Sequence, residues 1–403
     1  MSADKYVPGY AFLLTVLLLG QALGTMATSI LPAVAPKVAE TLGIPASSIG
    51  YQVSIVAVFM LVSLLFGANL AVRWGATRVC QIGLAITALG AVMTIIPHPA
   101  FLFLSAVPLG AGYALISPAG SQLMMRYTPA LNRNFMFSLK QSGVPMGGMA
   151  AALFAPAMAV TLGWQWSLVV NAAAMVLLAV WMERGREHWD TDKNPTANWL
   201  TSPLGGLTIV WKTPALRWLG IAGGAFVVMQ VALSTYTVLF FVEDLKFGLV
   251  QAGLVLTASQ IGGVAGRVFW GWLADAMSNC FAALAVLAAV MAMSSLMCLA
   301  ITASTPLVAC YALFFVLGST GSGWNGAFLA EVARLAPESE VSSATGGSLF
   351  LVNLGRLVGP LMFSAALALG GNYATAFALL ALPSLLGLMC LWRARAPRPA
   401  LKH

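Results

Sequence analysis

Charge is the scarcest property of this sequence. Asp, Glu, Lys and Arg make up 8% of its 403 residues, whereas hydrophobic residues make up 60%. A typical soluble domain carries about 25% charged residues, so water is not the main solvent of this chain. The composition therefore excludes a soluble enzyme, a nucleic-acid-binding protein and a disordered chain. We expect a lipid bilayer to surround most of the protein.

The sequence also lacks the motifs of metal sites, nucleotide sites and catalytic sites. Its five cysteines lie in or beside apolar runs and do not have the spacing of metal ligands, which predicts small buried side chains rather than a disulfide framework or a zinc site. There is no GxxxxGK[ST], no HExxH and no nucleophile elbow. We therefore expect no ATP-driven step, no enzymatic activity, no metal and no cofactor.

Acidic residues are missing from the middle of the apolar runs. Glu243, Asp275 and Glu331 stand near the ends of such runs, and His98 falls in a short connection. Proton-coupled exporters of cations usually need an embedded carboxylate. A positive interior without acids instead favours an anion by Coulomb attraction, which is stronger at low dielectric.

Long apolar runs, by contrast, are abundant. A bilayer core about 30 Å thick requires about 20 apolar residues per helix, and twelve stretches of the chain meet this requirement. They predict an all-α membrane protein with twelve transmembrane helices. The stretches are 10–35, 48–70, 79–97, 101–126, 135–160, 164–182, 216–242, 249–272, 281–302, 306–330, 344–370 and 372–392.

Basic residues predict the orientation of these helices. With the N-terminus inside, fifteen Lys and Arg fall in cytoplasmic segments, whereas only Lys37 and Lys246 fall on the opposite face. Such a bias places both termini in the cytoplasm. The opening residues carry little positive charge and no cleavage site, so we expect the first helix to be retained. The protein is expected to be a multi-pass protein of the plasma (inner) membrane.

One long polar stretch divides the apolar runs six and six. It predicts an N-terminal six-helix bundle over 1–183, a cytoplasmic linker over 184–215, a C-terminal six-helix bundle over 216–393 and a cytoplasmic tail over 394–403. A shift of 203 residues lays Gly50 on Gly253 and Leu70 on Leu273. Parallel repeats of six helices, with a binding site where they meet, are an architecture of transporters.

Two short connections carry a family motif. After the second apolar run, Leu70, Arg73 and Gly75 match G-x-L-x-D-R-x-G-R, whereas Ala68, Val72 and Ala76 depart from it; after the eighth, Gly271, Leu273 and Asp275 match. On these residues the chain resembles the major facilitator superfamily. The resemblance implies that Arg73, Gly75, Gly271 and Asp275 take part in gating, with the acidic latch kept in only one half. The alternative is that the glycines merely form tight turns.

Three basic residues, Lys140, Arg267 and Arg356, fall inside the apolar runs. Arg356 is about 12 residues from the start of its run, which corresponds to about 18 Å of helix. A charge at that depth must face the bundle interior. We expect Arg356 to meet a substrate or a water-filled cavity; the alternative is a structural hydrogen-bonding role.

Arg267 stands in the stretch GRVFWGWLAD. This stretch resembles G-R-x-x-W-G-x-x-[SA]-D of the oxalate/formate antiporter family, and monocarboxylate transporters have a similar Arg. The resemblance implies that Arg267 binds a substrate carboxylate and that Arg356 matches a second basic residue of that family. From the residues alone, snorkelling of Arg267 or pairing with Asp275 is an equal alternative.

Lys140 opens the fifth apolar run. We expect its ammonium to extend to the cytoplasmic surface, and the alternative is a place in an anion funnel. Four polar residues at membrane depth complete the candidate substrate-binding set, with hydrogen bonding between helices as the alternative for each. Gln260 comes first among them because it lies seven positions before Arg267, on the same helix face. The others are Tyr236, Asn325 and Asn353.

These observations favour a secondary transporter of a small organic anion, a carboxylate, that works by alternating access. Anion exchange and proton symport both remain open, and a functional monomer is expected. One alternative is a multidrug exporter, which the helix-5 glycines Gly143, Gly147 and Gly148 and the many Met and Phe residues would suit. Another is a receptor with the same fold that binds a ligand without moving it.

Overall fold

The computed structural model describes residues 9–127, 139–191, 193–196, 205–336 and 341–394. Within these ranges all regular structure is helical. Among the described residues, eleven helices are long and apolar enough to cross a membrane, and a shorter apolar helix, Ser48–Leu64, stands where the second span is predicted. The expected all-α membrane fold is confirmed, while the count of twelve spans and their orientation stay predictions.

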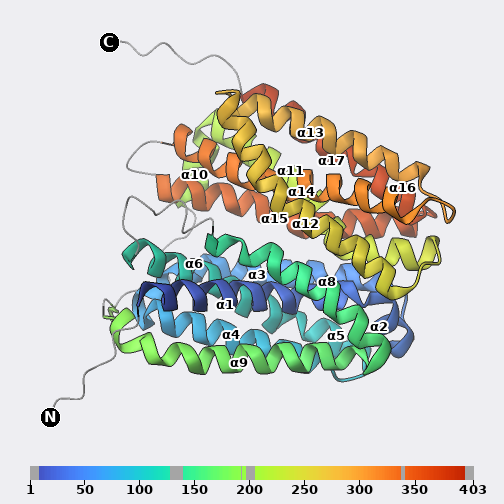
Figure 1. Cartoon of the computed structure of the whole chain (residues 1–403). Helices are drawn as coiled ribbons and strands as arrows, with labels where there is room; N and C mark the ends of the chain where they lie inside the picture. Colours follow the sequence, from blue (N-terminus) through green and yellow to red (C-terminus); the bar gives the residue numbers. More distant parts are fainter. Residues whose placement is uncertain (1–8, 128–138, 192, 197–204, 337–340, 395–403) are drawn as a thin grey trace, which may run out of the picture. The chain divides into compact units, whose positions relative to one another are not determined.

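The chain folds into two compact units, Met1–Thr201 and Ser202–His403. Figure 1 shows the helices of each unit running roughly along one another, as helices of a bundle do. The first unit contains α1 (Tyr10–Ala33), α2 (Ala35–Leu42), α3 (Ser48–Trp74), α4 (Ala76–Thr94), α5 (Pro99–Leu104), α6 (Ala106–Tyr127), α8 (Gly143–Thr161) and α9 (Trp164–Trp189).

The second unit begins with a short helix that precedes its long ones. It contains α10 (Gly205–Lys212), α11 (Pro214–Leu239), the π-helical turn η2 (Phe240–Asp244), α12 (Leu249–Ala276), α13 (Cys280–Met297), the 3-10 turn η3 (Cys298–Ala300), α14 (Leu307–Leu335), α15 (Val341–Ala368), α16 (Tyr373–Leu379) and α17 (Ala381–Ala394).

Small residues allow the helices of both units to approach closely. In the first unit, a Cβ added at Gly147 of α8 would lie 2.1 Å from the carbonyl oxygen of Ala22 on α1. One added at Gly110 of α6 would lie 2.2 Å from the carbonyl oxygen of Val56 on α3. Bilayer helices lack a strong hydrophobic drive to associate, so close packing at such positions is a main source of their attraction.

The second unit is built in the same way. A Cβ added at Gly318 of α14 would lie 1.8 Å from the carbonyl oxygen of Ser259 on α12, and one at Gly355 of α15 would lie 1.9 Å from that of Gly224 on α11. These two glycine contacts fix α12 against α14 and α11 against α15. They also set the rotation of the helices that carry Arg267 and Arg356.

Helix α9 continues to Trp189, beyond the end at residue 182 that hydropathy indicates. Its polar last turns are held by side chains of the same unit: Glu183 accepts hydrogen bonds from Arg186 at 2.6 Å and from Gln81 of α4 at 2.8 Å. Charged side chains that find partners can continue a helix beyond its apolar part. The segment predicted as linker therefore begins as helix, and α10 forms later within it.

Acidic residues also tie α11 to α16 at the other end of the second unit. Asp244 accepts a hydrogen bond from the backbone N–H of Tyr373 at 2.8 Å, and Glu243 accepts one from the Tyr373 hydroxyl at 2.7 Å. Both carboxylates belong to the π-helical turn that ends α11. They hold the start of α16 in place.

Candidate substrate site and gating turns

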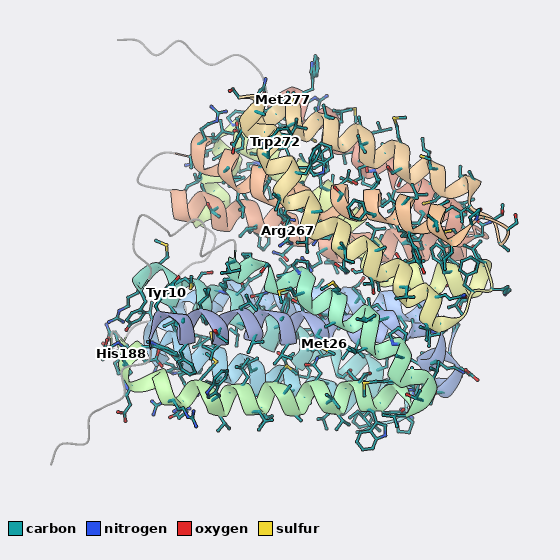
Figure 2. The ribbon with its side chains drawn as sticks, viewed as in Figure 1. Tyr10, Met26, His188, Arg267, Trp272 and Met277 are labelled. Carbon is teal, nitrogen blue, oxygen red and sulfur yellow. The ribbon has the colours of Figure 1, made fainter. Side chains whose placement is uncertain are left out.

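Arg267 projects from α12 in the second unit (Figure 2). Its neighbour Gly266 packs against α14, where an added Cβ would lie 2.2 Å from the carbonyl oxygen of Ser319. Trp270, one turn on, donates its indole N–H to the Ser319 hydroxyl at 3.2 Å. The Arg267 side chain is half-buried and its Nε is buried. The contacts of Gly266 and Trp270 with α14 therefore fix the rotation of the helix that carries the Arg267 guanidinium.

Arg356 lies fifteen residues after the start of α15 at Val341 and twelve before its end at Ala368. The helix rises about 1.5 Å per residue, so the nearer end is about 18 Å away. Gly355 and Gly359 turn toward α11, and Arg356 is half-buried with a buried Nε. This cation thus lies near the middle of an apolar helix, as the length of its apolar run predicts.

The other polar candidates of the second unit differ in how firmly they are held. The Asn325 amide donates to the carbonyl oxygen of Ser322 at 3.1 Å, and the Asn353 amide donates to that of Leu349 at 2.8 Å. Both bonds stay within one helix and leave the amide oxygens as acceptors. Gln260 is half-buried on α12 and makes no hydrogen bond within the described part of the chain.

Tyr236 is fully buried against α15. Its hydroxyl donates to the carbonyl oxygen of Pro360 at 2.9 Å and lies 2.8 Å from the Ser364 hydroxyl. Its ring stacks on Phe363 with 3.9 Å between ring centroids. These contacts are those of a side chain that joins α11 to α15, which corresponds to the alternative role of hydrogen bonding between helices.

Lys140 belongs to the first unit and precedes α8 by three residues. It is 1% exposed, and its ammonium donates to the Ser117 carbonyl oxygen at 2.9 Å and to the Ser121 hydroxyl at 3.0 Å, both on α6. The expected extension of this side chain to the cytoplasmic surface is therefore wrong. Acceptors on a neighbouring helix satisfy the ammonium inside the bundle. Hydropathy cannot show that these acceptors lie beside Lys140, because they belong to another helix.

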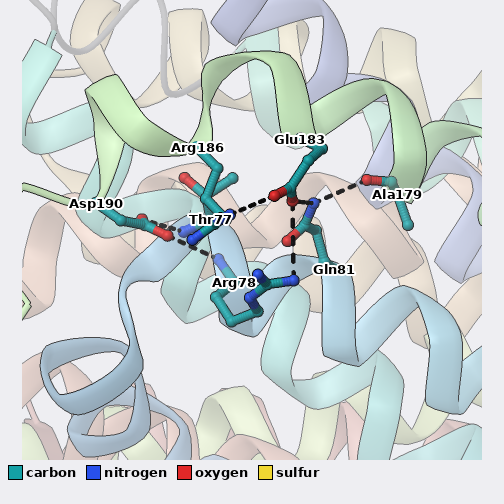
Figure 3. A network of polar contacts seen from close by, with 7 residues as sticks. All are labelled: Thr77, Arg78, Gln81, Ala179, Glu183, Arg186 and Asp190. Atoms are coloured by element: carbon teal, nitrogen blue, oxygen red, sulfur yellow. Dashed lines mark hydrogen bonds and ion pairs between the residues drawn. The ribbon is translucent and has the colours of Figure 1, made fainter. Parts of the chain in front are cut away.

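The turn between α3 and α4 is held by a residue that sequence reasoning missed. Figure 3 shows the Asp190 carboxylate accepting from the backbone N–H of Thr77 at 2.8 Å and of Arg78 at 3.1 Å. Asp190 therefore caps α4, where an anion also suits the helix dipole. Gly75 forms the turn with φ +94°, and a Cβ there would lie 2.4 Å from the Asp190 Cγ.

The chain after α9 is fixed to the same turn by further bonds. The backbone N–H of Asn194 donates to the Val72 carbonyl oxygen at 2.8 Å. Arg126, in the last turn of α6, donates to the Thr191 hydroxyl, and Tyr127 donates to the His188 carbonyl oxygen at 2.8 Å. We call the segment 188–194 the clasp, because contacts from α3, α4 and α6 hold its described residues.

The corresponding turn of the second unit is capped locally. Asn279, within the turn, accepts from the backbone N–H of Ala282 at 3.1 Å, and Asp275 is exposed. An added Cβ at Gly271 would meet nothing within 4 Å. Arg73 is half-buried at the end of α3. Gating by Arg73, Gly75, Gly271 and Asp275 stays a prediction, since only Gly75 is constrained by its surroundings.

Replacing Asp190 by asparagine is expected to lower the free energy of unfolding by about 1–2 kcal/mol, because a charged cap that accepts two backbone bonds is exchanged for a neutral one. Thermal unfolding in detergent measures the loss. Asp275→Asn is the control, since this exposed carboxylate lies in the corresponding turn, and it should leave the transition unchanged. Equal transitions for Asp190→Asn and wild type would contradict the capping role.

A family model described as Major Facilitator Superfamily matches residues 17–360. An uncharacterized MFS-type transporter of Mycobacterium tuberculosis is 26% identical over 247 residues, which cover 60% of this chain and 53% of the relative. The quinolone resistance protein NorB of Staphylococcus aureus is 25% identical over 150 residues, which cover 36% of this chain and 32% of NorB. The matched regions thus span about half the length of the first relative and a third of the second.

Among solved structures, a POT family transporter in complex with 5-aminolevulinic acid superposes with a TM-score of 0.78. The match covers 96% of this chain and 98% of that transporter at 14% sequence identity, so it shows a shared fold. Across the residues that the structure describes, no group of three or more His, Cys, Asp or Glu side chains is placed to hold a metal ion.

Proposed function

Because the chain belongs to the Major Facilitator Superfamily, we propose that it is a secondary transporter that carries a small organic anion, a carboxylate, across the membrane. Family membership and the transporter relatives indicate that it is a multi-pass integral membrane protein and not an enzyme. The observation that carries the anion is the position of Arg356, a half-buried cation about 18 Å of helix from the nearer end of α15.

Arg356 and Arg267 form the proposed anion site. A guanidinium presents a planar fork of donors that matches a carboxylate and stays charged at any physiological pH. Such charge-assisted bonds are about twice as strong as neutral ones, and a low dielectric strengthens them further. Both arginines carry a buried Nε, which supports a site shielded from bulk water.

Polar neighbours on the same two helices would orient the substrate. Gln260 lies seven positions before Arg267, and Asn353 lies three before Arg356, so each amide shares a helix face with an arginine. Asn325 lies on α14 and supplies an amide oxygen in this proposal, whereas the fully buried Tyr236 joins α11 to α15 and supports the site from behind. The amide of Gln260 is the best suited of them, because no other described residue engages it.

Alternating access is proposed to follow from movement of the repeats about this site. In this proposal Arg73, Gly75, Gly271 and Asp275 contribute to gating, both termini lie in the cytoplasm, the membrane is the plasma (inner) membrane and a monomer suffices. Coupling is either exchange of two anions or symport with a proton.

A multidrug exporter is the second candidate function. The similarity to NorB, named for quinolone resistance, favours it over 36% of the chain. In that reading the cavity would accept hydrophobic compounds and would not depend on the two arginines. The interior of an exporter of cations usually contains an embedded carboxylate, which the apolar runs of this sequence lack at comparable depth.

Counterflow in proteoliposomes distinguishes the two functions. Purified wild-type protein is reconstituted and loaded in turn with unlabelled formate, lactate, oxalate or succinate, and uptake of the matching labelled anion is followed. Ethidium and tetraphenylphosphonium are tested in parallel, and protein-free liposomes give the leak. We expect saturable uptake of at least one carboxylate and none of the two cations.

Each other outcome has a defined meaning. Movement of the lipophilic cations without any carboxylate would contradict the proposal and support the exporter. Saturable binding of a carboxylate to the detergent-solubilised protein without counterflow would identify a receptor on the same fold.

A further inference from the structure

Lys140 is a buried cation that the proposed anion site does not use. It is 1% exposed in the first unit, whereas Arg267 and Arg356 both lie in the second. Its stem lies across Gly120 of α6, where an added Cβ would be 3.2 Å from the Lys140 Cε and 3.4 Å from its Nζ. Burial of an ammonium in such a closely packed place costs free energy unless the charge is paired. A functional role would explain why this cost is tolerated.

The partners of this ammonium are neutral. Its two described acceptors are the Ser117 carbonyl oxygen and the Ser121 hydroxyl, and no carboxylate of the described residues lies within ion-pair distance of it. The preceding segment, 128–138, contains no Asp or Glu. Lys140 thus differs from Arg334, which pairs with the buried Glu331 at 2.8 Å, and from Arg186, which pairs with Glu183.

The surrounding helices supply no compensating charge. Within its bounds, α1 contains no charged residue, and neither does α8. On α4 the titratable group that interacts with Lys140 is the Cys80 thiol, which donates to the Ile116 carbonyl oxygen. On α6 the other titratable groups are already bonded: Tyr113 to Gln21 and Thr25, and Arg126 and Tyr127 to the clasp.

The hydrogen bonds of Lys140 suit a charged and a neutral amine equally. In the charged state the ammonium donates to both acceptors, while the Ser121 hydroxyl donates to the Ser117 carbonyl oxygen at 2.8 Å. In the neutral state the amine still donates to Ser117, and its lone pair accepts from the Ser121 hydroxyl. The change requires only that one hydroxyl hydrogen rotates from Ser117 to the amine, so no heavy atom has to move.

Lys140 is also the buried basic group that can change its charge. Arginine stays protonated in proteins, whereas a buried lysine amine releases its proton readily. Five described carboxylates near helix ends are engaged elsewhere: Glu183 and Glu331 with arginines, Asp190 with the start of α4, and Glu243 and Asp244 with Tyr373. Asp275, at the end of α12, is exposed rather than buried.

We propose that Lys140 is a proton-binding site, which binds one proton for each anion that the transporter carries. This inference rests on the anion transport proposed above. The step is transfer of a proton from the Lys140 ammonium to water, which leaves a neutral amine and a hydronium ion, and its reversal. A proton bound at Lys140 adds one positive charge to the protein, so that a proton and a monovalent anion are carried together without net charge. The carrier is then a symporter of an anion and a proton.

Two transport modes of the same proteoliposomes test this coupling. Counterflow needs no proton gradient, whereas symport with one proton gives about tenfold accumulation for each pH unit of gradient. The probe is the labelled carboxylate of the panel that wild type exchanges fastest. With a gradient of one pH unit, we expect Lys140→Arg, which keeps the charge but cannot release the proton, to lower the ratio of gradient-driven accumulation to counterflow about tenfold. Lys37→Arg, an exposed lysine paired with Glu40, should keep the wild-type ratio.

Nuclear magnetic resonance of the lysine side chains tests the proton site without a substrate. The protein is labelled with ¹⁵N-lysine, and the Lys140 signal is assigned by its absence in Lys140→Arg or, if that variant does not fold, by its displacement in Ser121→Ala. We expect this signal to change from ammonium to amine within the pH range in which the folded protein is stable.

The outcomes separate the two proposals. A Lys140 that stays charged throughout that range, or a Lys140→Arg variant with the wild-type accumulation ratio, would overturn the proton site and leave anion transport intact. A titrating Lys140 in a protein that moves no carboxylate would support the proton site and contradict the proposed substrate.

Discussion

Replacing Arg356 by glutamine is expected to lower carboxylate counterflow about 100-fold. Loss of one partner of a buried, hydrogen-bonded charge pair costs about 2–5 kcal/mol, and about 3 kcal/mol corresponds to a factor of more than 100 in affinity. The substrate would bind through Arg267 alone, and the negative charge of the substrate would be poorly compensated. Initial rates of counterflow at several substrate concentrations measure the loss.

Two further variants show whether the effect belongs to the guanidinium. Arg356→Lys keeps the charge but loses the planar fork, so we expect an intermediate rate. Arg217→Gln is the matched control, because Arg217 lies at the start of α11 over the rings of Trp211 and Trp218, and it should transport as wild type does. If Arg356→Gln elutes as a single species and shows wild-type counterflow, Arg356 is not part of the anion site.

Replacing Gly318 by alanine is expected to lower the free energy of unfolding by about 3 kcal/mol or to prevent folding. The added methyl group would lie 1.8 Å from the carbonyl oxygen of Ser259, and this backbone atom cannot move without separating α12 from α14. Overpacking of this kind costs about 1–3 kcal/mol where side chains can adjust, and more where they cannot. Thermal unfolding in detergent measures the change.

Gly326→Ala is the matched control, because Gly326 is also on α14 but an added Cβ meets nothing within 4 Å. The two variants carry the same change of side chain on one helix, so intrinsic helix propensity affects them alike. We expect Gly326→Ala to be at least as stable as wild type, since alanine favours helix over glycine by about 1 kcal/mol. Equal stability of the two variants would show that the α12–α14 contact is looser than the structure indicates.

Most of the fold could be predicted from the sequence, because the bilayer imposes a length and a composition on each helix. The predicted start of the span at 48 and of the span at 249 agree with the first residues of α3 and α12. Hydropathy fails where a helix leaves its apolar part. The end of α9 at Trp189 depends on Gln81 and Arg186 as partners of Glu183, and neither partner is visible in an average over neighbouring residues.

The candidate site could be predicted in part. The position of Arg356 near the middle of its helix follows from counting residues along the apolar run, and α15 extends well beyond it on both sides. The surroundings of Lys140 could not be derived, because Ser117 and Ser121 precede it by 23 and 19 residues on another helix. Asp190 is farther still from its partner Thr77, at 113 residues. Asp190 follows a polar helix end, where acidic residues are common, so its presence there does not indicate that it caps another helix.

The contacts of Asp190 also decide where the polypeptide can be divided into two separately expressed pieces. Each unit has its own core, so co-expression of an N-terminal and a C-terminal fragment is a natural design. A break after Glu183, where hydropathy places the end of the first bundle, would separate α4 from its cap Asp190, and Val72 from Asn194, onto different fragments. A break between Asn194 and Gly205 would leave the clasp on its own fragment and the start of α10 on the other.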